Sequence, residues 1–200
     1  PFPGCRPSDI VFAKDGTMYV LAMTEGQVWR TRAPPEGHPR QVNWQRYASG
    51  FYHPIGLAMV GERLFVAQKP EITELIDHDG DGTVDHYRTL ATGWGLSTGW
   101  HEYCFGLAVD RQDNLWFALN TGYFWTNPGY VNPGRWRGSV MRVNLKSEKL
   151  TEVAKGCRVP NGICIDGNND LFFTDNQGDW IQACKLAHVV EGRFYGHPEY

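Results

Sequence analysis

The apolar and polar positions of this chain alternate in short runs, a pattern typical of β-strands with one buried face. Four stretches share one layout: a small or polar pair, an alternating apolar run, a turn with Gly or Asn, and a second run rich in aromatic and β-branched residues. They are SDIVFAKDGTMYVLAM (8–23), PIGLAMVGERLFVAQ (54–68), CFGLAVDRQDNLWFALN (104–120) and PNGICIDGNNDLFFTDN (160–176). Each predicts a β-hairpin.

The hairpins recur at a nearly constant interval. Aligning Ile10, Leu57, Leu107 and Ile163 separates successive hairpins by 47, 50 and 56 residues. A recurrence in this range, built from strands alone, is typical of β-propeller blades. The segment LKSEKLTEVAKG (145–156) is polar enough for a helix, but its place after a strand favours a hairpin. Further strand-like segments would supply the outer strands of the blades: GQVWRTR (26–32), EITELID (71–77) and GSVMRVNL (138–145).

The sequence therefore predicts an all-β fold, a single β-propeller domain over residues 1–200 with about four visible blades. Propellers close into a ring so that no strand edge is exposed. Because four-bladed rings are uncommon, we expect the chain to be part of a longer propeller, incomplete at both ends.

Composition narrows the classes of partner. The 23 Gly, 12 Pro, 8 Trp, 9 Tyr and 10 Phe agree with strands joined by turns. A formal net charge of −3 argues against nucleic acid or an anionic membrane surface as the main partner. No apolar run reaches the length of a membrane span. The five cysteines are either buried thiols or form up to two disulfides, which would indicate an oxidising compartment.

One loop, DHDGDGTVD (77–85), concentrates negative charge. It matches the first half of a DxDxDG calcium loop, but Arg88 stands at the twelfth position, where an EF-hand requires Glu. Carboxylates so close repel one another unless a cation neutralises them. We therefore predict a structural calcium site, with a solvated acidic turn as the alternative. The predicted ligands are Asp77, Asp79, Asp81 and Asp85.

Five segments carry a resemblance to a known family: HPIGLA, LFVAQKPEITELIDHDGDGTVDHY, WHEYCFGLAVDRQDNLWFALN, RVPNGICIDGNNDLFFTDNQGDW and GRFYGHP. They resemble the glucose/sorbosone dehydrogenase propellers, and more narrowly the membrane-bound dehydrogenase-like proteins of planctomycete-type bacteria, which often carry haem c or helical-repeat domains. The soluble quinoprotein glucose dehydrogenase, a more distant relative, is a six-bladed propeller that uses pyrroloquinoline quinone (PQQ) and calcium. The resemblance covers nearly the whole chain.

The resemblance implies a function and a place for it. It implies a six-bladed ring and a dehydrogenase that oxidises a sugar, polyol or related alcohol with PQQ as hydride acceptor. It further implies a periplasmic or extracellular location and a cytochrome c domain or protein as electron acceptor. The alternative is a non-catalytic propeller that binds carbohydrate or acts as a structural scaffold.

Two residues are the predicted catalytic groups. His101 precedes an inner strand, and in the resembled family a His at this place takes the proton from the sugar hydroxyl; an imidazole is a competent base near neutral pH. A loop His that bonds the backbone is the alternative, and His53 is interpreted as structural. Arg158 also precedes an inner strand, where the family has an Arg that faces the quinone.

The resemblance also implies a cofactor-binding turn in TDNQGDW (174–180). One position departs from the family: Val159 follows Arg158, where the quinoproteins have Asn. An aromatic insertion (122–138), with Trp94 and Trp100 nearby, either stacks on sugar rings or packs on itself over the channel. The predicted cofactor-binding residues are Arg158, Asn161, Gln177, Gly178 and Asp179.

Overall fold

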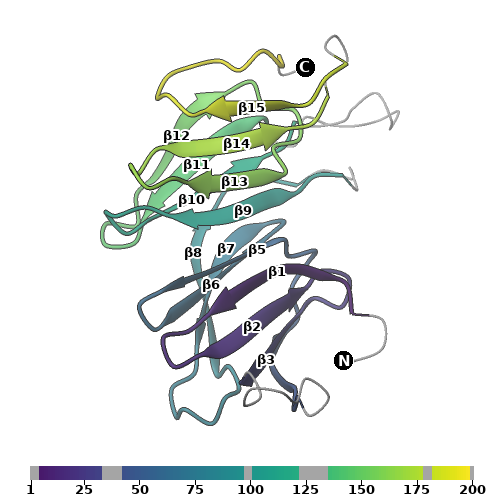
Figure 1. Cartoon of the computed structure of the whole chain (residues 1–200), viewed down its shortest axis with the longest axis vertical. Coiled ribbons are helices and arrows are strands. Elements are labelled where there is room, and N and C mark those ends of the chain that lie inside the picture. Colours follow the sequence, from purple (N-terminus) through teal and green to yellow (C-terminus); the bar gives the residue numbers. More distant parts are fainter. Residues whose placement is uncertain (1–4, 33–41, 97–100, 122–134, 178–181, 199–200) are drawn as a thin grey trace.

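The computed structural model describes residues 5–32, 42–96, 101–121, 135–177 and 182–198, and in these ranges the regular structure is entirely β. The strands form four antiparallel sheets in which chain neighbours are also sheet neighbours (Figure 1). The first two sheets are β1 (Pro7–Phe12), β2 (Thr17–Ala22), β3 (Gln27–Arg32) and β4 (Gln45–Ser49), then β5 (Gly56–Val60), β6 (Arg63–Gln68), β7 (Glu71–Ile76) and β8 (His86–Thr92). The others are β9 (Cys104–Val109), β10 (Asn114–Leu119), β11 (Ser139–Asn144) and β12 (Leu150–Lys155), then β13 (Gly162–Ile165), β14 (Leu171–Asp175) and β15 (Lys185–His188).

The four sheets are the blades of a β-propeller. The first strand of each blade packs beside the first strand of the next, so that β1, β5, β9 and β13 follow one another around the axis. Figure 1 shows the first blade at the bottom and the fourth at the top. The predicted all-β propeller with four blades is confirmed. Within the described residues, the fourth blade has three strands.

The hairpins predicted from alternation are the inner two strands of each blade. In the second blade Val60 pairs with Arg63 across a turn at residues 61–62, and in the fourth Ile163 pairs with Phe173. The segment 145–156 forms a turn and the outer strand β12, as expected. Strands β4, β8 and β15 did not stand out from the sequence, because at least half of the residues in each are exposed.

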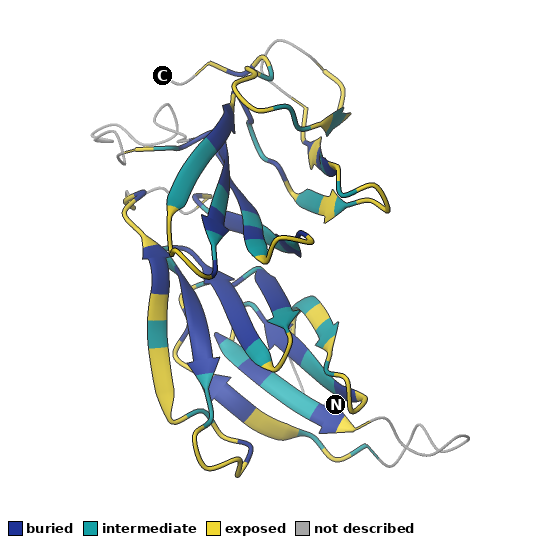
Figure 2. Ribbon diagram, turned by 90° about the vertical axis from the view of Figure 1, so that its left-hand side faces the viewer, coloured by how far each residue is buried: buried dark blue, intermediate teal, exposed yellow. Residues whose placement is uncertain are grey.

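The core lies between blades rather than inside one sheet. In β6, Leu64 and Val66 pack toward the first blade, whereas Phe65 and Ala67 pack toward the third. A third cluster, including Ala118 of β10, fills the space between the third and fourth blades. Figure 2 shows buried residues along the strands of neighbouring blades and exposed residues mainly in the turns. Each buried large apolar side chain stabilises the fold by about 1.5–3 kcal/mol, so the successive blades hold one another in place.

The inner strands approach one another so closely that glycine is required. A Cβ on Gly56 would overlap the backbone carbonyl of Gly106, and a Cβ on Gly106 would overlap the side chain of Ile163. Gly106 also has φ of 69°, which disfavours any residue with a Cβ. In the first blade Asp9 takes the equivalent place, and its carboxylate accepts a hydrogen bond from the N–H of Leu57 at 2.7 Å.

The inner strands all run in the same direction, so the propeller has two distinct faces. We call the face where the inner strands begin the entry face. It carries residues 50–55, 93–96, 101–103 and 156–161 and lies to the right in Figure 1. The opposite face, here the turn face, carries the hairpin turns and the acidic loop 77–85. No helix in the described ranges is long and apolar enough to cross a membrane. All five cysteines are free thiols, and Cys104 and Cys157 are buried.

Candidate functional site at the entry face

His101 is exposed on the loop that leads into β9, and Asn120 holds this loop. Asn120 directly follows β10. Its amide donates to the backbone carbonyl of His101 at 2.7 Å, and its side-chain oxygen accepts from the N–H of Tyr103 at 2.6 Å. Asn120 is fully buried, so this anchor is shielded from water. The loop is therefore fixed at the residues that flank the imidazole.

Arg158 lies on the equivalent loop one blade further on, before β13. Its backbone N–H and that of Val159 donate to the buried carboxylate of Asp175, at 3.0 and 2.7 Å. The Arg158 guanidinium donates to the carbonyl of Gln177 at 2.6 Å. Arg158 is therefore held against the turn that follows β14, where the cofactor-binding residues were predicted.

The two loops share one support. Asn120 holds the His101 loop, and the N–H of the adjacent Thr121 donates to the carbonyl of Arg158 at 2.9 Å. Asn120 and Thr121 are both buried at the end of β10. Because two consecutive residues hold both loops, the backbones of His101 and Arg158 belong to one region of the entry face.

A buried lysine lies at the centre of this region. Lys69, in the turn between β6 and β7, is 2% exposed. Its ammonium lies 5.1 Å from the ring centre of Tyr52 and 4.9 Å from that of Tyr103. Its carbonyl accepts a hydrogen bond from the indole N–H of Trp94 at 2.7 Å. Aromatic faces stabilise a cation that has been removed from water.

The charges around Lys69 form a small group. Glu102 is fully buried, and its carboxylate lies 3.8 Å from the guanidinium of Arg137, which is 3% exposed. Arg137 also donates to the carbonyl of Gly95 at 2.8 Å, so it joins the loop before β9 to the loop after β10. Burial lowers the pKa of Lys69, while the nearby Glu102 acts to raise it.

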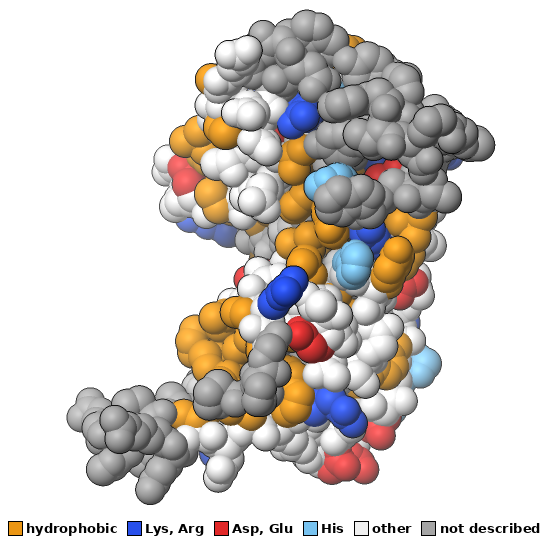
Figure 3. Space-filling model, turned by 90° about the vertical axis from the view of Figure 1, so that its right-hand side faces the viewer, with side chains coloured by type: hydrophobic (Ala, Val, Ile, Leu, Met, Phe, Trp, Pro, Cys, Tyr) orange, Lys and Arg blue, Asp and Glu red, His pale blue; other side chains and the backbone are white. Residues whose placement is uncertain are grey.

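The histidines at this face are affected by the same lysine. Partial desolvation, followed by the charge of Lys69, lowers the pKa of His101 below its ordinary value, and the same two causes lower the pKa of His53. A lowered pKa favours the neutral imidazole, the form that can accept a proton. Figure 3 views the entry face and shows histidine and basic side chains close together among apolar ones.

The remaining predicted cofactor residues are placed only in part. Asn161 is exposed directly before β13, and Gln177 is exposed in the turn after β14. Gly178 and Asp179 lie outside the described residues. Val159 contributes backbone groups, because its N–H bonds Asp175 and its carbonyl accepts from the N–H of Asn176 at 3.2 Å. The departure at Val159 thus leaves the loop anchored while removing a polar side chain.

The aromatic residues near the site divide into two groups. Trp94 is fully buried, packs against Phe117 at 5.3 Å between ring centres, and belongs to the core, so its ring is not available to stack on a ligand. Trp100 and residues 122–134 of the aromatic insertion lie outside the described residues. Tyr52, by contrast, is 51% exposed and offers an accessible ring beside His53.

The acidic loop lies between β7 and β8 on the turn face, away from these residues. Carboxylate oxygens of Asp77, Asp79 and Asp85 lie within 4.8 Å of one another. Asp81 belongs to the predicted ligands but not to this group; its carboxylate accepts from the N–H of Thr83 at 2.7 Å. Within the described residues, the grouped carboxylates are therefore those of Asp77, Asp79 and Asp85, and the ligand role of all four aspartates stays a prediction. Calcium binding itself stays a prediction.

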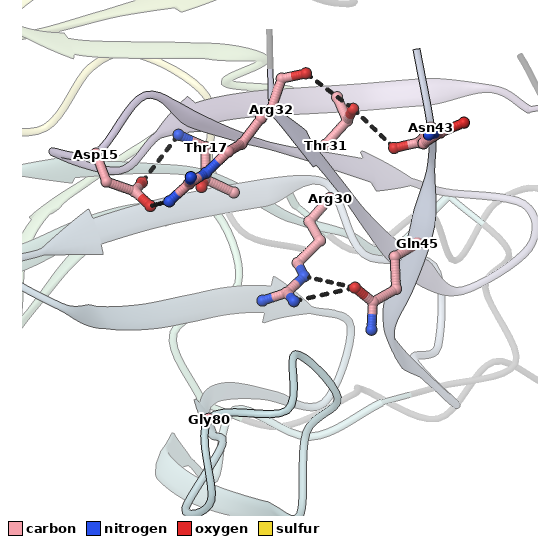
Figure 4. Close-up of a pocket in the computed structure, with 8 residues that line it drawn as sticks. All are labelled: Asp15, Thr17, Arg30, Thr31, Arg32, Asn43, Gln45 and Gly80. Atoms are coloured by element: carbon pink, nitrogen blue, oxygen red, sulfur yellow. Dashed lines mark hydrogen bonds and ion pairs between the residues drawn. The ribbon is translucent and has the colours of Figure 1, made fainter. Parts of the chain in front are cut away.

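The loop is packed against the first blade by Arg30. Gly82 has φ of 88°, and a Cβ there would overlap the Arg30 guanidinium. Arg30 donates two hydrogen bonds to Gln45, at 3.1 and 3.0 Å, beside a pocket of about 360 Å³ that Gly80 helps to line (Figure 4). A guanidinium thus contacts the loop and offsets part of its negative charge.

Sequence reasoning missed four polar residues of the entry face. The signal for Lys69 was its position directly after the buried strand β6, and for Asn120 its position at the end of β10. Both are strand-end positions on the face that carries His101. Nothing in the local pattern indicated that Glu102 and Arg137 are buried. The four are Lys69, Glu102, Asn120 and Arg137.

The comparisons with known proteins agree with this fold. The family described as Domain of unknown function (DUF7133) matches residues 5–196. Among curated proteins, no match is found. Three solved structures illustrate the structural likeness. A protein from Thermus thermophilus assigned as an oxidoreductase (glucose dehydrogenase) superposes with a TM-score of 0.75 and 17% identity, over 98% of this chain and 66% of that one.

The other two are also similar in fold at low identity. An iodide structure of a Trichoderma reesei member of carbohydrate-active enzyme family AA12 has a TM-score of 0.74 and 16% identity, over 96% of this chain and 55% of that chain. The PQQ-bound aldose sugar dehydrogenase of Streptomyces coelicolor has a TM-score of 0.72 and 15% identity, over 97% of this chain and 63% of that chain. This chain thus spans between 55% and 66% of the length of these structures.

Proposed function

This chain belongs to the DUF7133 family, and we propose that it forms part of a quinoprotein-type dehydrogenase that oxidises a sugar or related alcohol. The observation that carries the proposal is the joint support of the His101 and Arg158 loops by Asn120 and Thr121. A proton acceptor and a fixed positive charge in one region are two of the groups that an alcohol dehydrogenase uses, and a cofactor would supply the hydride acceptor.

In this proposal His101 accepts the proton of the substrate hydroxyl. The imidazole is exposed, its flanking backbone is fixed by Asn120, and its pKa is lowered, so the neutral form dominates at neutral pH. Arg158 supplies a permanent positive charge, oriented by the Gln177 carbonyl. His101 would take up the proton of the hydroxyl. Arg158 would stabilise the negative charge that develops on the hydride acceptor.

The cofactor proposed for this face is PQQ with calcium. PQQ carries carboxylates, and the guanidinium of Arg158, held by the Gln177 carbonyl, would fit an anionic group. When bound, PQQ would accept the hydride that leaves the alcohol carbon. Asn161, Gln177, Gly178 and Asp179 are the residues proposed to hold the cofactor and its calcium, and Val159 removes one polar contact from that set.

The calcium proposed for the acidic loop is structural. Asp77, Asp79 and Asp85 would supply carboxylate oxygens, with ligand distances of about 2.3–2.6 Å. We also propose a periplasmic or extracellular location, with a cytochrome c domain or protein as electron acceptor, in keeping with the resemblance to the glucose/sorbosone dehydrogenases.

The test is a titration of the full-length protein with PQQ in the presence of Ca²⁺, followed by a dye-reduction screen over sugars. His101→Ala should lower the rate by about 10²–10⁴-fold, the usual loss of general-base help. His86→Ala is the matched control, since His86 is an exposed histidine on β8. Saturable carbohydrate binding without PQQ binding or dye reduction would instead favour the non-catalytic propeller.

A further inference from the structure

The loop before β5, residues 50–55, is anchored like the two loops that carry the proposed catalytic groups. The N–H of Tyr52 donates to the side-chain oxygen of Gln68, the last residue of β6, at 2.8 Å. In the next two blades a polar side chain at or directly after the end of the second strand also accepts an N–H of the loop; these side chains are Asn120 and Asp175. One arrangement thus fixes the entry-face loops of three successive blades.

Tyr52 is held at its backbone and at its ring. Its carbonyl accepts the N–H of Lys69 at 3.1 Å, and its ring centre lies 5.1 Å from the Lys69 ammonium. Gln68 is buried, and its amide donates to the hydroxyl of Thr73 at 2.9 Å, so the anchor of the loop is itself fixed. Tyr52 is nevertheless 51% exposed, and its hydroxyl has no hydrogen-bond partner among the described residues. A polar group that is placed in advance lowers the entropic cost of binding a ligand.

The two ring nitrogens of His53 differ in their surroundings. Nδ1 is buried and makes no hydrogen bond within the described structure, whereas Nε2 is accessible to solvent. Desolvation, followed by the charge of Lys69, lowers the pKa of His53, so the ring is neutral at neutral pH. A proton on Nδ1 would be a buried donor without an acceptor, and the positive charge of Lys69 opposes it. The proton of the neutral ring therefore belongs on Nε2, from which it can be donated outward.

Tyr52 and His53 form a fixed pair beside the His101 loop. Their rings stack at 5.0 Å between centres, and the His53 ring lies 6.1 Å from that of Tyr103, two residues after His101. His53 has φ of 45°, which is uncommon for residues other than Gly. Backbone strain of this kind persists where the surroundings hold it, and it clusters at functional sites. The pair thus presents a hydroxyl and an imidazole N–H at the face that carries the proposed base.

We propose that Tyr52 and His53 bind two hydroxyl groups of a neutral sugar and so position it next to His101. The Tyr52 hydroxyl can donate and accept a hydrogen bond, and the Nε2–H of His53 donates one, so sugar hydroxyls satisfy both without a charge on the ligand. Because its accessible nitrogen carries the proton, His53 does not act as the base. His53, interpreted from the sequence as structural, thereby gains a role in binding. This inference rests on the function proposed above for the same face.

The first experiment measures the binding of neutral sugars to the full-length protein without PQQ, by NMR titration. The probes are D-glucose, D-galactose and D-xylose. At least one of them should bind saturably, and absence of binding by all three would overturn the proposal.

A tyrosine variant tests the hydroxyl with the sugar that binds most tightly. Tyr52→Phe keeps the ring and should weaken binding by about 3- to 10-fold, the effect of one hydrogen bond between neutral groups. Tyr87→Phe is the matched control, because Tyr87 is 43% exposed on β8, the outer strand of the same blade, and should leave the affinity unchanged. An unchanged affinity in Tyr52→Phe would overturn the proposal, and this result does not depend on any change at the strained residue.

Two amide variants separate binding by His53 from a purely structural role. Asn tolerates a φ of 45° better than Gln, but its shorter amide ends near the position of Nδ1, whereas the Gln amide reaches the position of Nε2. Sugar affinity should therefore fall by about 3- to 10-fold in His53→Asn and be kept in His53→Gln. The free energy of unfolding, measured with urea, should follow the opposite order. An affinity that follows stability, higher for His53→Asn than for His53→Gln, would make His53 structural and overturn the proposal.

Kinetics of the same variants distinguish this subsite from the dehydrogenase itself. In a dye-reducing protein, Tyr52→Phe and His53→Asn should raise KM in proportion to the lost affinity and leave kcat nearly unchanged. A lowered kcat at unchanged KM would place the pair in the chemical step and overturn the proposal. Unchanged kcat and KM in both variants would also overturn it, while the dehydrogenase stands. Sugar binding that Tyr52→Phe weakens, in a protein that neither binds PQQ nor reduces dye, supports the subsite and contradicts the dehydrogenase.

Discussion

Replacing Gly106 by Ala tests how closely the inner strands pack around the axis. Two costs add at this position. Its φ of 69° costs a residue with a Cβ about 1–2 kcal/mol. The new methyl group would also overlap the Ile163 side chain, and overpacking of this kind costs about 1–3 kcal/mol. The expected loss in the free energy of unfolding is therefore about 2–5 kcal/mol.

Gly61→Ala is the matched control, because Gly61 has a similar φ of 63° but a Cβ there would meet nothing within 4 Å. It should cost only the backbone part, about 1–2 kcal/mol. Urea unfolding followed by tryptophan fluorescence measures both. Adding Ile163→Ala to Gly106→Ala should destabilise by less than the sum of the single variants, because it removes the overlapping methyl group. Equal losses for Gly61→Ala and Gly106→Ala, or strict additivity with Ile163→Ala, would refute the close approach.

Three further predictions concern single polar residues. Asp110 accepts four hydrogen bonds in the β9–β10 turn; burial raises its pKa, but bonds from Asn114, Trp116 and Gln112 outweigh this and lower it. The stabilisation from the ionised Asp110 is thus complete above the unfolded pKa of about 3.9 and is lost as pH falls through the lower folded pKa. Asp110→Asn should lower the free energy of unfolding by about 2–3 kcal/mol at pH 7 and make it less dependent on pH below pH 4, as measured by urea unfolding. Calcium in the acidic loop, at 100 times its Kd, should stabilise the wild type by about 2.7 kcal/mol in thermal unfolding relative to EGTA. Asp77→Asn should reduce this gain more than Asp81→Asn. Equal effects of the two variants would contradict the grouping of Asp77 with Asp79 and Asp85. Asn120→Ala should lower the rate of dye reduction but change the affinity for the sugar little, because it frees the His101 loop and removes no contact to the ligand. An unchanged rate would contradict the positioning role of Asn120.

The sequence by itself determined the blades. Period-two alternation and turn residues depend only on neighbours along the chain, so they located the inner hairpins and the segment 145–156 before any contact was known. The spacing of the hairpins then indicated a propeller. The aspartates of the acidic loop could be located in the same way, because the residues that contribute to the loop are consecutive.

Tertiary structure alone decided which side chains meet. Lys69 and His101 come from different blades, and their proximity depends on how the second blade packs against the third, which no local pattern encodes. The same packing buries Trp94, an aromatic residue for which the sequence left both stacking on a sugar and packing within the protein open. Within the acidic loop, the backbone path turns Asp85 rather than Asp81 toward Asp77 and Asp79. Alternation reports whether a side chain faces the core or the solvent; the partner that it meets is set by strand register and by the packing of distant segments.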